Sequence, residues 1–278
     1  MKTLLTTAHR IIMLRSAVLI LAVVTFGWIT PLAASALLIQ ADFEEGNASD
    51  FQAIESPNKV DTFSHFGIPS LQGGGNYCIS NNSTGGVDDA NYTQFFYNKN
   101  ALSNGYLRFY FLLPNNFKAN GNQANTIKFA LMRAIGSGDQ DLYLFESGGA
   151  LKFNWQHAAV GYNSGSIMST AISKNQWHYI EINLNTSSGT VRIWFDKNSS
   201  GSPTWTNQGT GDSPYPQSTS IIQFNDNWSG GLAPQTQAWY LDGVTWSDSP
   251  IGDTYGLLGA PPPPDTTPPS VPSGVQVQ

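Results

Sequence analysis

The clearest alternation of apolar and polar residues lies in segment 176–196. Isoleucine or leucine occupies every second position from 180 to 184, and valine, isoleucine and phenylalanine do so from 191 to 195, after the sequence NTSSG. A period of two on both sides of a turn predicts an antiparallel hairpin with one apolar face. The other face carries the polar and aromatic residues Tyr179, Glu181, Asn183, Arg192 and Trp194. This face is therefore either solvated surface or the site of a polar ligand.

Similar patterns predict further short strands. In segment 105–113, Leu107, Phe109 and Phe111 share one face, whereas Arg108 and Tyr110 share the other. No stretch of helical length after position 36 shows the helical period. Short strands separated by turn residues predict an all-β, two-sheet antiparallel β-sandwich. The remaining predicted strands are 37–46, 77–80, 92–97, 126–134, 141–146, 150–157, 220–225 and 237–247, with a loop at 81–86 and a turn at 136–139.

The first 36 residues predict a secretory signal peptide that takes no part in the fold. Lys2, Arg10 and Arg15 precede the apolar run 17–29, which is too short to span a bilayer comfortably. An A-x-A cleavage pattern ends at Ala36. We therefore expect cleavage after Ala36 and a secreted, extracellular protein without a membrane span. An uncleaved N-terminal anchor is the alternative.

The charge balance argues against nucleic acid or an anionic membrane as a partner. After removal of segment 1–36 and its three basic residues, the chain contains 10 Lys and Arg and 19 Asp and Glu, which gives a net charge of −9. Such partners draw most of their binding free energy from basic side chains placed at phosphates. Cys78 is the single cysteine, so no intramolecular disulfide can form, and we expect a buried thiol.

The composition changes at the C-terminal end, where seven of the 16 prolines lie between Pro261 and Pro272. Four consecutive prolines favour an extended polyproline II conformation, which predicts a linker over 259–268. The sequence from Asp265 resembles the opening of bacterial fibronectin type III modules, in which a D-T-x-P-P-x-x-P-x-G run precedes the first strand. Segment 269–278 would then be the truncated start of a downstream module in a multimodular bacterial protein. A plain disordered tail is the alternative.

Motifs in three places resemble the laminin-G-like, concanavalin A-like jelly-roll domains. The sequences WHYI at 177–180 and GTVRIWFD at 189–196 are similar to two adjacent strands of that superfamily. Its D-F-E-x-G first strand has a counterpart at 42–46, and its closing strand has one at 240–244. The resemblance implies a jelly roll over 37–258 whose concave sheet often holds a glycan chain. Lectin-like modules, glycoside hydrolases and polysaccharide lyases all occur among its members, so the fold alone does not indicate which of these functions a domain has.

A retaining glycoside hydrolase of this fold would need two carboxylates about 5–5.5 Å apart, which one strand supplies from acidic residues two positions apart. Glu181 lacks such a partner, because its same-face neighbours are Tyr179 and Asn183. Asp139 and Asp141 have the spacing, but the pattern predicts them in or beside a turn.

A polysaccharide lyase needs a base and a group that neutralises a uronate carboxylate. Gln176, Trp177 and His178 match the Q-x-H motif of jelly-roll alginate lyases, but the R-x-E and Y-x-K-x-G-x-Y strands of those enzymes have no counterpart. His178 also shares the parity of Ile180, which points it toward the core or the sheet edge. A lyase or hydrolase is therefore the alternative function.

Glycan binding needs less machinery than either reaction. Sugar rings stack their C–H faces on aromatic rings, and their hydroxyls bond to amides, carboxylates and guanidinium groups. The polar face of the hairpin offers this mixture, and Trp155 and Trp228 extend it, although each tryptophan is alternatively a core residue. We expect a glycan-binding module whose partner is a polysaccharide or cell-surface glycan. An adhesive or spacer module without a sugar site is a further alternative.

Asp42, Glu44 and Asp242 are the candidate metal ligands. If the first and last strands pair, as the resemblance implies, their carboxylates lie close together, and Ca²⁺ prefers six to eight oxygen ligands. We therefore expect a structural calcium ion and no other cofactor. The alternative is that Asp42 and Glu44 simply flank a turn.

Overall fold

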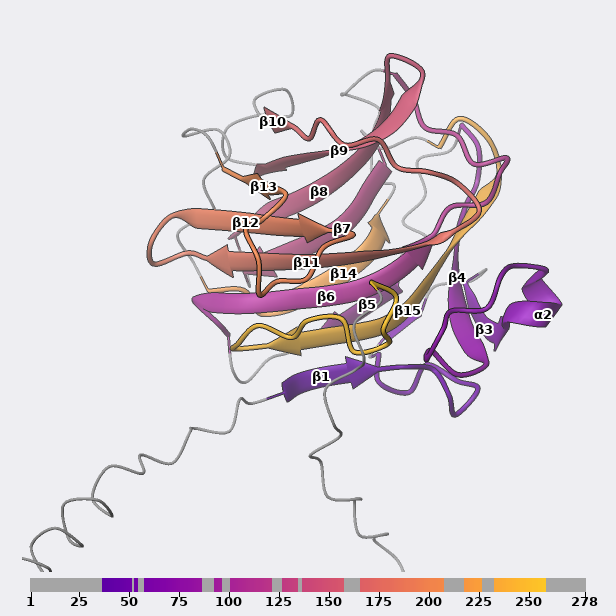
Figure 1. Ribbon diagram of the computed structural model, residues 1–278, viewed down its shortest axis with the longest axis horizontal. Coiled ribbons are helices and arrows are strands. Elements are labelled where there is room, and N and C mark those ends of the chain that lie inside the picture. Colours follow the sequence, from indigo (N-terminus) through magenta and orange to yellow (C-terminus); the bar gives the residue numbers. More distant parts are fainter. Residues whose placement is uncertain are drawn as a thin grey trace, which may run out of the picture. The chain divides into compact units, whose positions relative to one another are not determined.

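The computed structural model describes residues 37–51, 53–54, 58–86, 93–96, 101–121, 127–134, 137–157, 166–207, 218–226 and 233–258. Within them the chain forms two antiparallel β-sheets packed face to face (Figure 1). The predicted β-sandwich is therefore confirmed. The predicted signal peptide, the proline-rich linker, the fibronectin-like segment and Trp228 lie outside the described residues. Among the described residues, no helix has the length and apolar character needed to cross a membrane.

Over the described ranges, sheet A has eight strands and sheet B has seven. The order in sheet A is β13 (Trp205–Thr206), β12 (Thr190–Phe195), β11 (Trp177–Asn185), β6 (Asn104–Leu112), β15 (Gln237–Ser247), β4 (Tyr77–Ser83) and β3 (Lys59–Thr62), with β1 (Leu37–Ala41) also paired to β15. The order in sheet B is β10 (Ser166–Ile167), β9 (Ala150–His157), β8 (Ser137–Ser147), β7 (Ile127–Ala134), β14 (Ile221–Asp226), β5 (Thr93–Phe96) and β2 (Ala53–Ile54).

The main core lies between the two sheets and follows the predicted alternation. Leu107, Phe109 and Phe111 of β6 are fully buried there, and Phe129 of β7 packs edge-on against Phe111 with ring centroids 5.0 Å apart. Aromatic pairs of this kind add to the free energy of apolar burial. The residues between them on each strand must therefore face away from the core.

The predicted hairpin is confirmed. Ile182 of β11 pairs with Ile193 of β12, and residues 186–189 form the turn between the strands. His178 lies on the core side, as its parity predicts, with its ring stacked between Phe111 and Phe195 at 5.2 and 5.1 Å. Its Nδ1 lies 2.6 Å from Asp196 Oδ2 and its Nε2 lies 3.0 Å from the Ser173 carbonyl oxygen. These contacts give His178 a structural place inside the sandwich.

Other details differ from the expectation. β4 continues to Ser83, so the predicted loop begins later than 81. β8 begins at Ser137, so Asp139 and Asp141 lie within a strand, near its start. Segment 46–75 also contains β3 and the one-turn helix α2 (Phe63–Phe66). Because α2 lasts a single turn, its sequence carries no usable helical period.

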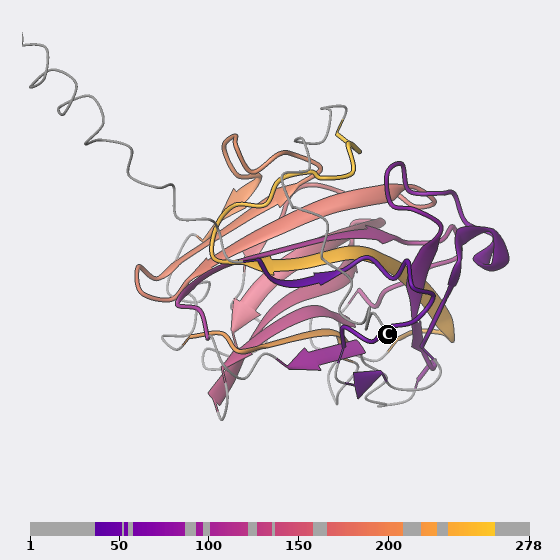
Figure 2. The ribbon, with the colours of Figure 1, turned by 90° about the horizontal axis from the view of Figure 1, so that it is seen from below.

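A segment without regular structure covers the outer face of sheet A, the face turned away from sheet B. This strap, residues 248–258, follows β15 and turns back to run beside β15 and β6 (Figure 1). Figure 2 shows the two sheets as layers, with the strap on the outer side of sheet A. A second hydrophobic cluster lies beneath it and beneath α2, and includes Phe63, Leu71, Cys78, Tyr110, Leu112, Trp177, Tyr179 and Trp194.

Candidate functional site

The strap holds the carboxylate of Glu181, the central residue on the outer face of the hairpin. Oε1 of Glu181 accepts a hydrogen bond from Ile251 N at 3.1 Å, and Oε2 accepts one from Gly252 N at 2.9 Å. The hydroxyl of Tyr179 also donates to Oε2. Three donors therefore satisfy a carboxylate that has no solvent exposure.

Arg108 and Tyr110 of β6 continue this buried network. Tyr110 donates to Asp253 Oδ1 at 2.6 Å, and Tyr255 of the strap stacks on the Tyr110 ring at 4.7 Å with an interplanar angle of 16°. Arg108 donates from Nη1 to the Tyr110 hydroxyl and from Nη2 to Thr245 Oγ1, at 3.0 and 2.5 Å. Burial raises the pKa of Tyr110 to about 12, so its hydroxyl stays protonated and available as a donor.

The predicted ligand residues of the hairpin are thus mostly covered. Tyr179, Glu181 and Asn183 have no exposed surface, and Trp194 is 5% exposed with its Nε1 donating to the Gly201 carbonyl oxygen at 2.8 Å. Arg192 alone is exposed, and it donates to Asn183 Oδ1 at 3.2 Å. A ligand cannot reach the other four residues while the strap and its neighbours lie as they do.

Trp155, the remaining described member of the predicted platform, belongs to the core between the sheets, where it is fully buried. Its parity on β9 places it with Phe153 and not with the polar residues of the strand. Trp155 is therefore a core residue, and its ring is unavailable as a stacking surface for a sugar.

The predicted pairing of the first and last strands is confirmed, with Ala41 of β1 opposite Val244 of β15. Two of the three candidate metal ligands, Glu44 and Asp42, accept backbone hydrogen bonds. Glu44 accepts from Tyr77 N at 2.9 Å and from Asn76 N at 2.9 and 3.1 Å, and Asp42 Oδ1 accepts from Glu44 N at 3.3 Å. Over the part of the chain that the structure describes, no group of three acidic, histidine or cysteine side chains is placed to hold a metal ion.

Asp242 is the exceptional member of this acidic group. Its Oδ1 accepts from Gly243 N at 2.6 Å, but its buried Oδ2 has no hydrogen-bond partner. Gly74 packs so closely that a Cβ there would lie 2.8 Å from Oδ2. Burial, reinforced by the charges of Glu44 and Asp42, raises the pKa of Asp242 well above its usual range. Either a proton or a cation would relieve this group, and the calcium ion stays a prediction.

The outer face of sheet B carries a different set of side chains. Lys128 of β7 pairs with Tyr143 of β8, and Tyr143 pairs with Asn154 of β9. Their neighbours Phe129, Leu144 and Phe153 face the core, so the three polar residues lie in one row on the opposite face. Exposed fractions are 2% for Lys128, 3% for Tyr143 and 1% for Asn154. The sheet therefore holds an ammonium group, a phenol and an amide in register.

A hydrogen bond joins this row to a second one. The Tyr143 hydroxyl donates to Asp141 Oδ2 at 2.7 Å, along the same strand. Asp141 pairs with Leu131, and Leu131 pairs with Gln223 of β14, so these residues form the next row across the face. The Oδ1 atom of Asn154 is buried and has no hydrogen-bond partner. Leaving a buried acceptor without a hydrogen-bond partner costs free energy.

This face was missed in the sequence although its signal is present. In 126–134, 141–146 and 150–157, polar residues alternate with the apolar ones that form the core. The hairpin 176–196 has the more regular pattern, so the ligand site was predicted on sheet A. Consecutive strands commonly pair, so the rows of sheet B could have been assembled from the pattern alone.

Comparisons with known proteins support the fold and no family. No protein-family model and no curated protein sequence matches the chain. Among solved structures, the chain is similar to the conserved carbohydrate esterase vb_24B_21 from Shiga toxin-encoding bacteriophage phi24B, with a TM-score of 0.53 and 13% identity over 77% of this chain and 99% of that one. At this identity the likeness shows a shared jelly-roll sandwich and nothing about activity.

Two further similar structures have lower scores. The cellulose induced protein Cip1 has a TM-score of 0.49 and 16% identity, over 77% of this chain and 99% of that one. Alginate lyase vAL-1 from Chlorella virus has a TM-score of 0.47 and 10% identity, over 76% of this chain and 99% of that one.

Proposed function

We propose that the chain is a secreted glycan-binding domain that holds a neutral or mildly charged polysaccharide against the outer face of sheet B. The observation that carries the proposal is the row Lys128, Tyr143 and Asn154, in cross-strand register on three adjacent strands. The side chains of this row are 1–3% exposed, as deeply buried as the hairpin face of sheet A, so a ligand reaches them only when the residues over the row move aside. The row replaces the hairpin face because the strap already satisfies the carboxylate of Glu181 there.

The chemistry of the row matches the groups that a sugar presents. An amide, an ammonium group and a phenol are all groups that form hydrogen bonds with sugar hydroxyls. The Oδ1 atom of Asn154 is an acceptor without a donor in the fold, so a ligand hydroxyl would satisfy it. Side chains packed across a sheet keep fixed positions, which lowers the entropy lost on binding.

The fold likeness is in line with this proposal. The similar phage protein is described as a carbohydrate esterase, and its chain is covered almost completely. A role in carbohydrate recognition therefore fits the architecture, while the residues above supply the specific hypothesis.

A glycan array probed with the purified, labelled chain tests the proposal. We expect binding to one class of polysaccharide, with Asn154→Leu weakening the affinity about tenfold, the value of one or two hydrogen bonds. Asn183→Leu, the same change at a buried asparagine on sheet A, serves as the matched control and should leave the affinity within a factor of two. Absence of binding to every glycan would leave the spacer module as the better account.

A second candidate, a polysaccharide-cleaving enzyme acting on the same face, rests on the Tyr143 and Asp141 pair. A phenol that donates to a carboxylate at 2.7 Å can move a proton, and Lys128 stands opposite Tyr143 in register. Asp139 and Asp141 both lie in β8, two positions apart along the strand.

Incubation with uronate polymers and with neutral glucans separates these possibilities. A lyase forms an unsaturated product that absorbs in the ultraviolet, whereas a hydrolase releases reducing ends without that absorbance. Tyr143→Phe should abolish turnover but leave polymer binding within about threefold, since it removes one hydroxyl. If no polymer is cleaved by the wild-type chain, the enzyme candidate is wrong and binding alone remains.

A further inference from the structure

A small pocket lies on sheet A where β3 runs into α2. It encloses about 250 Å³ and is lined by Thr62, Phe63, Ser64, Ser70, Asn76 and Tyr77. Pockets for drug-sized molecules measure roughly 300–1,000 Å³, so this one suits a smaller ligand with a single ring. None of the six lining side chains carries a charge at neutral pH.

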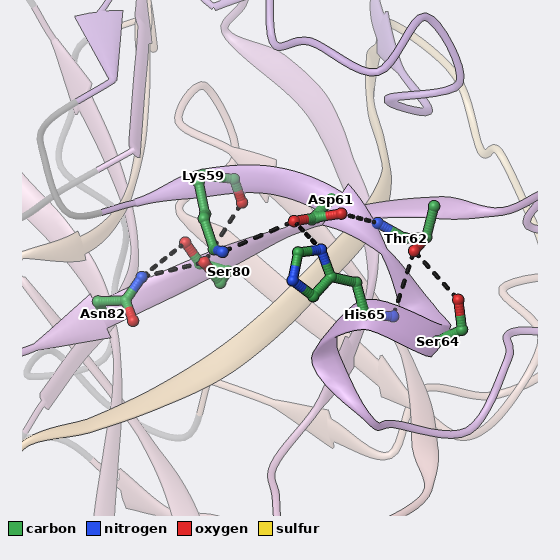
Figure 3. Close-up of polar contacts among 7 residues, drawn as sticks. All are labelled: Lys59, Asp61, Thr62, Ser64, His65, Ser80 and Asn82. Atoms are coloured by element: carbon green, nitrogen blue, oxygen red, sulfur yellow. Dashed lines mark hydrogen bonds and ion pairs between the residues drawn. The ribbon is translucent and has the colours of Figure 1, made fainter.

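Two hydroxyl groups at the rim keep hydrogen-bonding capacity. Thr62 Oγ1 accepts from His65 N at 3.2 Å and lies 3.1 Å from Ser64 Oγ. Figure 3 shows these two hydroxyls facing each other, whereas the ring of His65 turns toward Asp61. One hydrogen bond between two hydroxyls uses only one of their protons, so the other can be donated to a ligand.

The amide of Asn76 and the hydroxyl of Ser70 add uncommitted groups. Neither side chain makes a hydrogen bond within the described part of the chain. The backbone of Asn76 is nevertheless fixed, because its N donates to the Glu44 carboxylate at 2.9 and 3.1 Å and its carbonyl oxygen accepts from Phe63 N at 3.0 Å. A side chain with free donors on a fixed backbone is preorganised for binding.

Aromatic residues give the pocket an apolar side. The half-buried Tyr77 packs against the main core, which holds its ring in place at the pocket. Phe63 is 3% exposed and packs edge-on against Trp177 at 5.6 Å, which anchors α2 to the sheet. An aromatic wall beside neutral hydroxyl and amide groups is the combination that binds the two faces of a sugar ring.

We propose that this pocket binds a single neutral sugar unit. Its C–H face would lie against Tyr77, and its hydroxyls would bond to Thr62, Ser64, Ser70 and Asn76. The uncharged lining favours a neutral hexose over a uronate, and the Asp61 and His65 pair lies outside the lining. This site lies on sheet A, so the proposal for it can be tested independently of polysaccharide binding on sheet B.

Amide NMR shifts of the full chain, titrated with the methyl glycosides of glucose, galactose and mannose, test the proposal. One glycoside should shift the resonances of Ser64, Ser70, Asn76 and Tyr77 with a saturable dependence. Asn76→Leu should weaken that binding about tenfold. Asn116→Leu, the same change at an exposed asparagine elsewhere, should have no effect, and Tyr143→Phe on sheet B should have none either.

Three results would overturn the assignment. Glycerol producing the same shifts at the same concentration would mean that the pocket takes any small polyol. Equal affinity for methyl glucuronide would remove the preference for a neutral ring. Amide shifts confined to residues of sheet B would place all sugar binding there and show that this pocket binds no sugar.

Discussion

The outer faces of the two sheets carry similar kinds of residues but are used differently. On sheet A, Glu181 accepts from two backbone N–H groups of the strap, and Tyr110 stacks on the strap residue Tyr255. On sheet B, Asn154 keeps a buried acceptor without a partner. Polar and aromatic residues on a strand therefore do not reveal whether a face is open to a ligand. An unpartnered polar atom does not decide that question either, because Arg108 Nε on sheet A is also buried without a hydrogen-bond partner. Sheet A is distinguished by the strap that covers it and satisfies Glu181.

The largest expected effect comes from removing the strap. A chain that ends at Ser247 uncovers Tyr110 and Tyr179, and exposing two such side chains costs roughly 3–6 kcal/mol of stability. It also leaves the buried Glu181 carboxylate without two of its donors. Calorimetry should therefore show loss of cooperative unfolding, whereas a chain that ends at Leu258 should unfold like the full chain. Equal transitions for the two truncated chains would mean that the strap does not stabilise sheet A.

A smaller loss should follow Gly243→Ala, which disturbs the contact between β15 and the strap. Gly243 has a φ of 55°, and a Cβ there would lie 2.7 Å from Tyr255 Cε2 and 2.8 Å from Tyr110 Cδ2. Backbone strain of about 1–3 kcal/mol adds to this clash. We expect a fall in Tm of about 2–4 °C for each kcal/mol lost.

Gly189→Ala is the control for that change, because its φ is 67° but nothing lies within 4 Å of its added Cβ. It should show the strain without the clash, and thus the smaller fall in Tm. Identical falls for the two variants would refute a tight contact between the strap and Gly243.

Asp242→Asn tests whether a proton or a cation relieves the buried carboxylate. The pKa of Asp242 is raised in the folded state, so its stabilising contribution is complete below about pH 4 and is lost as the pH rises through the folded value. If a proton is responsible, Asp242→Asn should raise Tm at neutral pH, and the gain should shrink toward pH 4. Thermal denaturation with calcium and with chelator distinguishes the alternative. A bound calcium ion predicts that chelation lowers Tm of the wild type and that Asp242→Asn lowers it too.

The sequence predicted more of the fold than of the site. Alternation from 180 to 195 gave the hairpin and its core side correctly, because a period of two marks the buried face of a strand. β3 and α2 escaped notice because neither is long enough to show a period. The strap could not be predicted, since nothing in 248–258 indicates that its backbone N–H groups bind a carboxylate far back in the chain. That missing contact is why Glu181 and Tyr179 were expected on an open surface.

The smallest effect is expected at Arg192, the one exposed member of the predicted hairpin site. Arg192→Ala removes a hydrogen bond to Asn183 at 3.2 Å on the surface of sheet A. Such exposed contacts contribute little, about 0.5 kcal/mol or less. Chemical denaturation should therefore show nearly unchanged stability. A loss of several kcal/mol would show that the outer edge of the hairpin matters more than its exposure suggests.

The most direct test of glycan binding on sheet B compares the affinity of three chains for the polysaccharide that the array identifies. Isothermal titration calorimetry should show binding about tenfold weaker for Asn154→Leu and for Lys128→Met than for Arg192→Ala, whose affinity should equal that of the wild type. Tm values measured alongside establish that each variant is folded. The opposite order, with Arg192→Ala weakened and the sheet B variants unchanged, would contradict the account and return the site to the hairpin.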